Sequence, residues 1–283
     1  MHIPSLNMLD KTELILNDVL IKLKGDDFNF LTVAPHCGLY IPKDTLAVLD
    51  VENAETLNEL FNDGDPYTGD FNFVQNGGVS INAVLHRAVG DLNRKFDNNI
   101  ENGAIRRKSF RGYDLCVNEY PDNVLKELES YHAYFLQSIR AEIDTFHKRF
   151  PQKKLFFAQI HSMDEVRPIF YGEQIERPDL CVIAGAPGVY IDEDVLQVLM
   201  EELHDAFPNL DIRVNDPFNA EGNNHELLHL FANPTLGVNA FEFEINKRLY
   251  LRDKQKDFPQ MELLNRNLNK VFAKTVARIN FGL

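Results

Sequence analysis

The pattern that most restricts the fold of this chain is a long amphipathic segment followed by a continuous apolar run. In residues 122–150, apolar side chains recur every three or four positions, which predicts a helix with one buried face. Pro151 ends that helix, and the apolar residues 155–160 predict a buried strand. Strands joined through long helices favour parallel pairing in a sheet that helices cover on both faces.

The rest of the chain continues this mixture of helices and strands. We expect further helices at residues 9–23, 194–207 and 260–279, and strands at residues 28–34, 180–184, 211–214 and 238–250. No internal repeat and no Pro/Gly/Ser-rich linker divides the chain. The sequence therefore predicts an α/β fold with one domain over residues 1–283, a three-layer sandwich around a mostly parallel mixed sheet.

Charge and cysteine content narrow the class of partner. The 283 residues carry 43 acidic and 29 basic side chains, a net charge of −14, which disfavours binding to nucleic acid or to an anionic membrane surface. No apolar run is long enough to cross a bilayer. The three cysteines are widely spaced, as is usual in a reducing compartment. We expect a cytoplasmic protein that acts on a small molecule.

Two histidines lie at the predicted ends of strands. His36 belongs to the turn Pro35-His36-Cys37-Gly38, and His161 follows the strand at residues 155–160. Open α/β sheets bind ligands at the carboxyl ends of their strands, so the two imidazoles are candidate zinc ligands. The alternative for His36 is a polar turn, and for His161 a hydrogen-bonded core histidine.

A carboxylate would complete such a zinc site, because hydrolytic zinc centres often combine two imidazoles with one carboxylate and an open position. Asp65 and Asp70 are the nearest candidates, and both lie in a segment rich in Gly, Asp and Pro. That composition is also typical of an ordinary turn.

Further charged residues could serve substrate binding and proton transfer. Arg94, in Asp91-Leu92-Asn93-Arg94, offers a guanidinium that can bind a carboxylate with two hydrogen bonds. In the strand at residues 238–250, Glu242 and Glu244 share one face, opposite three apolar side chains. A glutamate beside a metal-activated water can act as a general base and then protonate the leaving amine.

One competing motif favours a different enzyme. His225-Glu226-Leu227-Leu228-His229 matches the H-E-x-x-H pattern of zinc metallopeptidases, in which both histidines lie on one helical face. Pro234 would end that helix after about two turns, and no further histidine follows at the spacing of a third ligand. A zincin-type peptidase using His225, Glu226 and His229 is therefore the alternative function.

In their order along the chain, the motifs resemble those of the N-formylglutamate amidohydrolase family, which belongs to a zinc-exopeptidase-like α/β group. The resemblance spans residues 31–250 and rests on Pro35-His36-Cys37-Gly38, Gly64-Asp65, Arg87 with Asp91-Leu92-Asn93-Arg94, His161-Ser162, Asn215-Asp216-Pro217-Phe218, Gly237 to Glu244, and Tyr250. It implies a sheet of the zinc carboxypeptidase kind and hydrolysis of an N-acyl amide on an acidic amino acid.

The same resemblance implies roles for individual residues. His36, Asp65 and His161 would bind the metal, with zinc as the expected ion, and Glu244 would be the catalytic glutamate. Substrate-binding candidates are Arg94, Asn93, His229 and Glu242; His229 corresponds to the histidine of an Arg-His pair in the family.

The chain also departs from the family pattern. Leu228 replaces the arginine of that pair, and Glu242 replaces a glutamine, so the cleft would lose a cation and gain a negative charge. These changes favour a neutral or amine-bearing N-acyl substrate. They also leave open a binding protein that keeps the fold without turnover.

Overall fold

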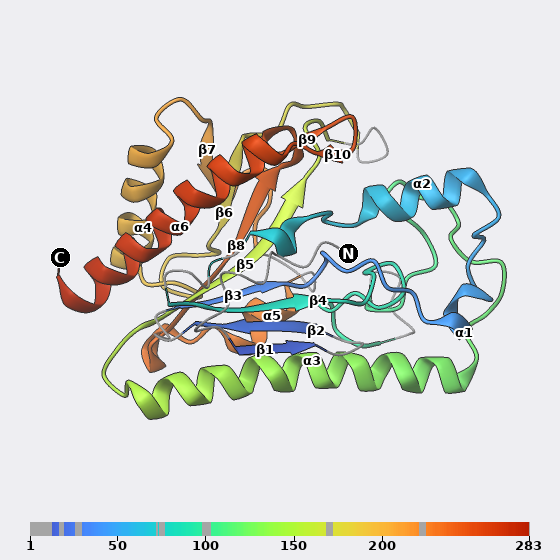
Figure 1. The fold of residues 1–283 in the computed structure, drawn as a ribbon, viewed down its shortest axis with the longest axis horizontal. Helices are drawn as coiled ribbons and strands as arrows, with labels where there is room; N and C mark the ends of the chain where they lie inside the picture. Colours follow the sequence, from blue (N-terminus) through green and yellow to red (C-terminus); the bar gives the residue numbers. More distant parts are fainter. Residues whose placement is uncertain are drawn as a thin grey trace.

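The computed structural model describes residues 13–16, 20–25, 30–71, 73, 77–97, 103–167, 172–220 and 225–282. Its centre is an eight-stranded sheet with the order β1-β2-β4-β3-β5-β8-β6-β7 (Figure 1). The strands are β1 (Glu13–Leu16), β2 (Leu20–Lys24), β3 (Phe30–Ala34), β4 (Val79–Ala83), β5 (Leu155–Met163), β6 (Leu180–Ile183), β7 (Ile212–Val214) and β8 (Val238–Asn246). The central strands β4, β3, β5 and β8 pair in parallel, whereas β1, β2 and β6 bring antiparallel pairings to the two sides.

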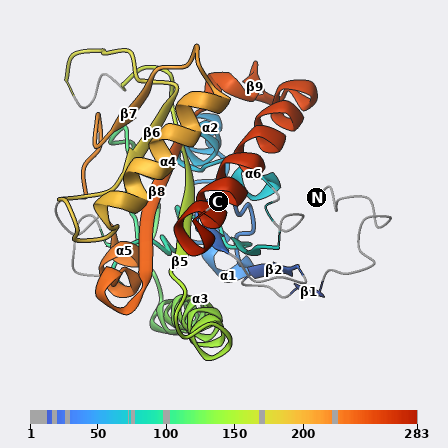
Figure 2. The ribbon, with the colours of Figure 1, turned by 90° about the vertical axis from the view of Figure 1, so that its left-hand side faces the viewer.

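Helices cover the sheet on both faces (Figure 2). The helices are α1 (Lys43–Leu46), α2 (Ala54–Asp63), α3 (Asp122–Arg149), α4 (Glu193–Ala206), α5 (Glu226–Phe231) and α6 (Phe258–Phe281). The long α3 and the short α5 lie on one face, and α4 and α6 pack together on the other. Short elements complete the described part: the 3-10 turns Thr68–Asp70, Pro234–Leu236 and Lys247–Leu249, and the pair β9 (Leu251–Arg252) with β10 (Gln255–Lys256).

Two apolar clusters hold these layers together. One joins α3 and α5 to the sheet and includes Phe135 and Phe231; the other joins α4 and α6 to the opposite face. In the second cluster Phe272 of α6 is fully buried, and its ring lies 5.3 Å from that of Phe156 and 4.8 Å from that of Phe73, measured between ring centroids. Rings of this size supply much of the apolar area that a core removes from water. The predicted three-layer α/β class is confirmed.

Most predicted elements are found within one to four residues of the expected bounds, and β8 has the predicted division into two faces. The exception is the amphipathic helix expected at residues 9–23, which is wrong where the chain is described: β1 and β2 pair there as antiparallel strands. Lys22 and Lys24 are two positions apart, so in a strand they share one face. Both form ion pairs with Glu142 of α3. Hydrogen bonding of β2 to β4 therefore outweighs the helical spacing of the leucines.

Among the described helices, none combines the length and apolarity that a membrane span requires.

Candidate active site

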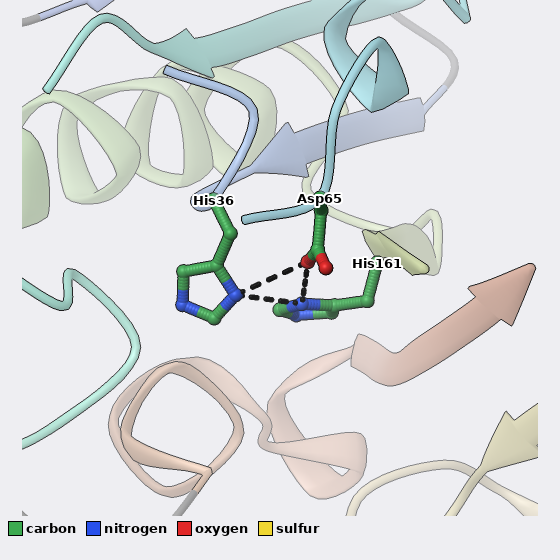
Figure 3. A group of neighbouring side chains, drawn as sticks. All are labelled: His36, Asp65 and His161. Atoms are coloured by element: carbon green, nitrogen blue, oxygen red, sulfur yellow. Dashed lines mark hydrogen bonds and ion pairs between the residues drawn. The ribbon is translucent and has the colours of Figure 1, made fainter. Parts of the chain in front are cut away.

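Three side chains from separate segments converge at the carboxyl ends of the central strands (Figure 3). His36 lies in the turn after β3, Asp65 follows α2, and His161 lies within β5. Nδ1 of His36 and Nδ1 of His161 are 3.1 Å apart, and Oδ2 of Asp65 lies 3.2 Å from the first and 3.1 Å from the second. All three side chains are buried. The structure thus brings together the three predicted metal ligands.

Asp91 determines which nitrogen of His36 is available in this cluster. Its Oδ1 lies 2.7 Å from Nε2 of His36, and its Oδ2 accepts a hydrogen bond from Arg87 at 2.7 Å. Burial raises the pKa of Asp91, but the charges of Arg87 and His36 outweigh it and hold that pKa well below the usual range. An ionised carboxylate only accepts hydrogen bonds, so Nε2 of His36 carries a proton and Nδ1 is free to bind a ligand.

The donor atoms fit a divalent metal ion. Without a proton on Nδ1 of His36, that atom and Oδ2 of Asp65 are two acceptors facing each other, an arrangement that a shared cation stabilises. A tetrahedral ion with bonds near 2.0–2.2 Å needs ligand atoms about 3.3 Å apart, close to the spacing of the three atoms here. Burial raises the pKa of Asp65, but its contacts with His161 and His36 hold it well below the usual range. Within the described residues, this is the one group of three or more such side chains placed to bind an ion.

Glu244 stands beside this cluster on the neighbouring strand. It is the cross-strand partner of His161 in the pairing of β5 with β8. Its Oε2 is buried and has no hydrogen-bond partner among the described residues. Burial raises the pKa of Glu244 to about 7; the charges of Asp65 and Glu242 add to this effect, and those of His161 and Arg177 oppose it. A carboxylate with a pKa near neutrality can both accept and release a proton.

Glu242 points to the same face of β8 but is fully engaged. Its Oε1 accepts a hydrogen bond from Nδ2 of Asn93 at 3.0 Å, and its Oε2 lies 2.8 Å from Nδ1 of His225. Burial raises the pKa of Glu242, but the hydrogen bond from His225 and the charges of His161 and His225 lower it overall. The negative charge expected from the sequence is therefore present, and an imidazole lies against it.

A cavity of about 380 Å³ contains these groups. The metal-site residues, Glu244 and Ser162 line it together with Asn93, Glu242 and His225. Its wall also carries six cationic side chains from several segments: Arg87, Arg94, Arg111, Arg167, Arg177 and Lys247. Carboxylates line the same wall, and Asp164 pairs with Arg111 and Lys247. The lining therefore suits a polar small molecule whose negatively charged group can pair with one of the other cations.

Other predicted residues lie elsewhere. Asp70, the second candidate for the carboxylate ligand, forms an ion pair with Lys256. His229 is exposed, and its Nδ1 lies 2.9 Å from the hydroxyl of Tyr190. His225 precedes α5 rather than lying within it. Its ring contacts Glu242, whereas the ring of His229 contacts Tyr190, so the two histidines of H-E-x-x-H do not form a group of metal ligands in the described structure.

Two functional contacts escaped the sequence reasoning. Asp91 was noted only as part of the motif that contains Arg94, and its contact with His36 spans 55 positions of the chain. His225 was considered only as a peptidase ligand. The sequence signal for Asp91 is a motif flanked by apolar residues, with Arg87 four positions earlier. No local signal marks the pairing of His225 with Glu242.

Comparisons with known proteins identify the family and the fold of this chain. The sequence model of the N-formylglutamate amidohydrolase family matches residues 28–251. The fold is similar to the crystal structure of N-formylglutamate amidohydrolase from Ralstonia eutropha JMP134, with a TM-score of 0.77, 15% identity, and coverage of 94% of this chain and 100% of that one. A gene product of Agrobacterium tumefaciens gives a TM-score of 0.68 at 18% identity, covering 93% of this chain and 96% of that one.

No match was found among curated protein sequences. At these identities the two structures establish the fold alone, while the sequence model covers most of the chain. The chain therefore belongs to the N-formylglutamate amidohydrolase family, a family of hydrolases that act on carbon–nitrogen bonds other than peptide bonds.

Proposed function

We propose that the protein is a metal-dependent amidohydrolase that removes the acyl group from an N-formyl or closely related N-acyl amino acid. The observation that carries this proposal is the convergence of His36, Asp65 and His161 in a cavity that also contains Glu244, whose buried Oε2 has no hydrogen-bond partner in the described part of the chain.

His36, Asp65 and His161 would hold the ion, and zinc is the ion that we propose for two imidazoles and one carboxylate. A divalent ion bound there would polarise the acyl carbonyl and lower the pKa of a bound water. Asp91 fixes the ring of His36 for this task through the bond to Nε2.

Glu244 is the proposed general base and acid. Its free oxygen faces no competing donor in the described structure, so it can accept the proton of the attacking water. As the oxygen of water joins the acyl carbon and the carbon–nitrogen bond breaks, the same carboxyl would return the proton to the departing nitrogen. The products are a carboxylic acid and a free amino acid.

Arg94 and the other cations of the cavity wall would bind the carboxylate of the amino-acid half. The sequence favoured a neutral or amine-bearing substrate because Glu242 adds a negative charge. The contact between Glu242 and His225 weakens that reasoning, since the carboxylate is occupied by hydrogen bonds from His225 and Asn93 instead of facing the substrate alone. An N-acyl amino acid therefore suits the cavity.

Metal stoichiometry is the first test. Wild-type protein and the variants His36→Ala and Asp65→Ala should be compared by elemental analysis after purification without an affinity tag. We expect one zinc per chain in the wild type and loss of zinc in both variants. Asp70→Asn is the matched control, because Asp70 is a carboxylate of the neighbouring turn that pairs with Lys256, and it should retain zinc.

Turnover is the second test, in a screen of N-acyl amino acids. Glu244→Gln should lower kcat by about 10²- to 10⁴-fold with full metal content, as expected for loss of a general base. Loss of zinc in Glu244→Gln would contradict the assignment. Retained metal with no hydrolysis by the wild type across the screen would favour a binding protein instead, and zinc that survives His36→Ala but not His225→Ala would favour the peptidase alternative.

A further inference from the structure

His225 presents one ring nitrogen that the described structure does not use. It is partly buried, precedes α5 and lines the cavity that contains the metal-site residues. Its Nδ1 is committed to Oε2 of Glu242 at 2.8 Å. A carboxylate accepts hydrogen bonds, so Nδ1 carries the proton of that bond in either charge state of the ring. Nε2 has no hydrogen-bond partner among the described residues.

The carboxylate of Glu242 accepts hydrogen bonds from several side chains, so its position is fixed and the ring of His225 that binds it is oriented. Besides His225 and Asn93, Gln159 donates to Oε1 at 3.2 Å when its amide is oriented so that its oxygen accepts from the N–H of Leu228. Glu242 itself is only 2% exposed. A carboxylate fixed in this way orients the imidazole that it binds, as in other carboxylate–histidine pairs.

Asn93 connects Glu242 to the start of α5. Its side-chain oxygen accepts from the N–H of Leu227 at 3.1 Å, and its backbone oxygen accepts from the N–H of Glu226 at 3.3 Å. The start of α5 is therefore attached to the segment that also carries Asp91. Nδ2 of Asn93 lies 3.5 Å from Nε2 of His161, so the pair of Glu242 and His225 adjoins the proposed metal site.

We propose that His225 binds the substrate through Nε2, with a hydrogen bond to a substrate oxygen, and that Glu242 is the positioning residue that orients its ring. The proposal rests on the function proposed above and assigns the pair a role in substrate recognition rather than in metal binding. A hydrogen-bonded pair of imidazole and carboxylate beside a reaction site provides a polar group in a fixed orientation, which lowers the entropy cost of binding.

Steady-state kinetics on the best substrate of the N-acyl screen test the contact. His225→Ala should raise KM about ten- to hundredfold, the worth of a hydrogen bond to a charged group, with kcat within about threefold of the wild type. His225→Gln, whose amide can approach the position of Nε2, should recover part of the lost affinity. Leu230→Ala is the matched control: it alters an exposed residue of α5, the helix that His225 precedes, and should leave KM unchanged.

Zinc content should be the same in all these variants. An unchanged KM in His225→Ala, or a fall in kcat alone, would overturn the contact with substrate. Loss of zinc would show instead that the residue supports the metal site.

A double-mutant cycle tests the positioning role of Glu242. Glu242→Gln keeps an oxygen for Asn93 and should raise KM in the wild type, yet it should add less than about twofold in the His225→Ala background, because its effect passes through the ring. Fully additive effects would overturn the positioning role.

Binding measurements separate this proposal from the proposed function. Isothermal titration of N-formyl-L-glutamate into Glu244→Gln protein, with and without His225→Ala, reports affinity in the absence of turnover. If the wild type hydrolyses nothing in the screen, the proposed function fails, while a tenfold weaker affinity in the double variant still supports the role of His225. Equal affinity in the two proteins, or no binding by either, overturns it.

Discussion

Protonation of His86 should control the acid stability of the fold. The ring is buried, its Nε2 lies 2.9 Å from the carbonyl oxygen of Leu60, and its Nδ1 accepts a hydrogen bond from the N–H of Ala88 at 3.0 Å. Both nitrogens of the neutral ring are therefore satisfied. A second proton on Nδ1 would face the N–H of Ala88 and would place a charge in the interior. Burial accordingly lowers the pKa of His86 from its ordinary 6.5 to about 4.

The size of the effect follows from linkage. Because the pKa of His86 is lower in the folded chain, the unfolded chain takes up the proton first as the pH falls. The stabilising contribution is complete above about pH 7 and is lost between pH 6.5 and 4. With these two pKa values the free energy of unfolding should fall by about 2 kcal/mol at pH 5 and about 3 kcal/mol at pH 4 through this residue alone.

Urea denaturation of the wild type and His86→Gln at pH 7, 6, 5 and 4, at equal metal load, measures this contribution. Glutamine does not titrate, so the stability difference between the two proteins should shrink by about 2 kcal/mol from pH 7 to pH 5. His204→Gln, at an exposed position of α4, is the control and should show the pH dependence of the wild type. Parallel curves for the wild type and His86→Gln would refute the reasoning, as would an NMR titration of the His86 ring near pH 6.5.

Two further changes test the framework of the site. Asp91→Asn removes the carboxylate that fixes the ring of His36. Zinc affinity, measured in competition with a chelating dye, should fall about 10- to 100-fold while the circular dichroism spectrum is retained. Unchanged affinity would contradict this role of Asp91. A Cβ atom on Gly38 would lie 2.4 Å from backbone atoms of Val84 and Leu85. Gly38→Ala should therefore lower the free energy of unfolding by about 2–3 kcal/mol through overpacking. An unchanged urea midpoint would show that the turn can move aside.

The sequence predicted elements best where their pattern is long. The 28 residues of α3 repeat one apolar face over many turns, and β5 is a continuous apolar run, so local pattern and burial agree. β4 and α2 were missed, because each is short and lies among the turn residues of a polar region. The amino-terminal residues have the spacing of a helix for a related reason: the pairing of β2 with β4 and with Glu142 depends on residues more than 50 positions away.

The metal-ligand candidates could be predicted because their location follows from topology. Parallel strands end at the same edge of a sheet, so His36 after β3 and His161 on its neighbour β5 lie close together in any fold of this class. Asp65 could not be separated from Asp70 in the same way, because both lie in turns whose path depends on tertiary contacts. In the structure Asp65 lies beside both histidines, whereas Asp70 forms an ion pair with Lys256, from the far end of the chain.

Glu242 and Glu244 show why residue roles need the structure. They are two positions apart on one strand face, and the residue pattern alone, without the family resemblance, does not distinguish them. Glu242 receives hydrogen bonds from Asn93 and His225, which lower its pKa. Glu244 has a buried oxygen without a partner among the residues that the structure describes, and burial raises its pKa to about 7. The difference comes from the 91–94 segment and the start of α5, which reach only as far as Glu242. One strand can therefore supply a fixed anion for recognition and a carboxyl that exchanges protons, because the elements packed above it, and not the strand itself, determine each charge state.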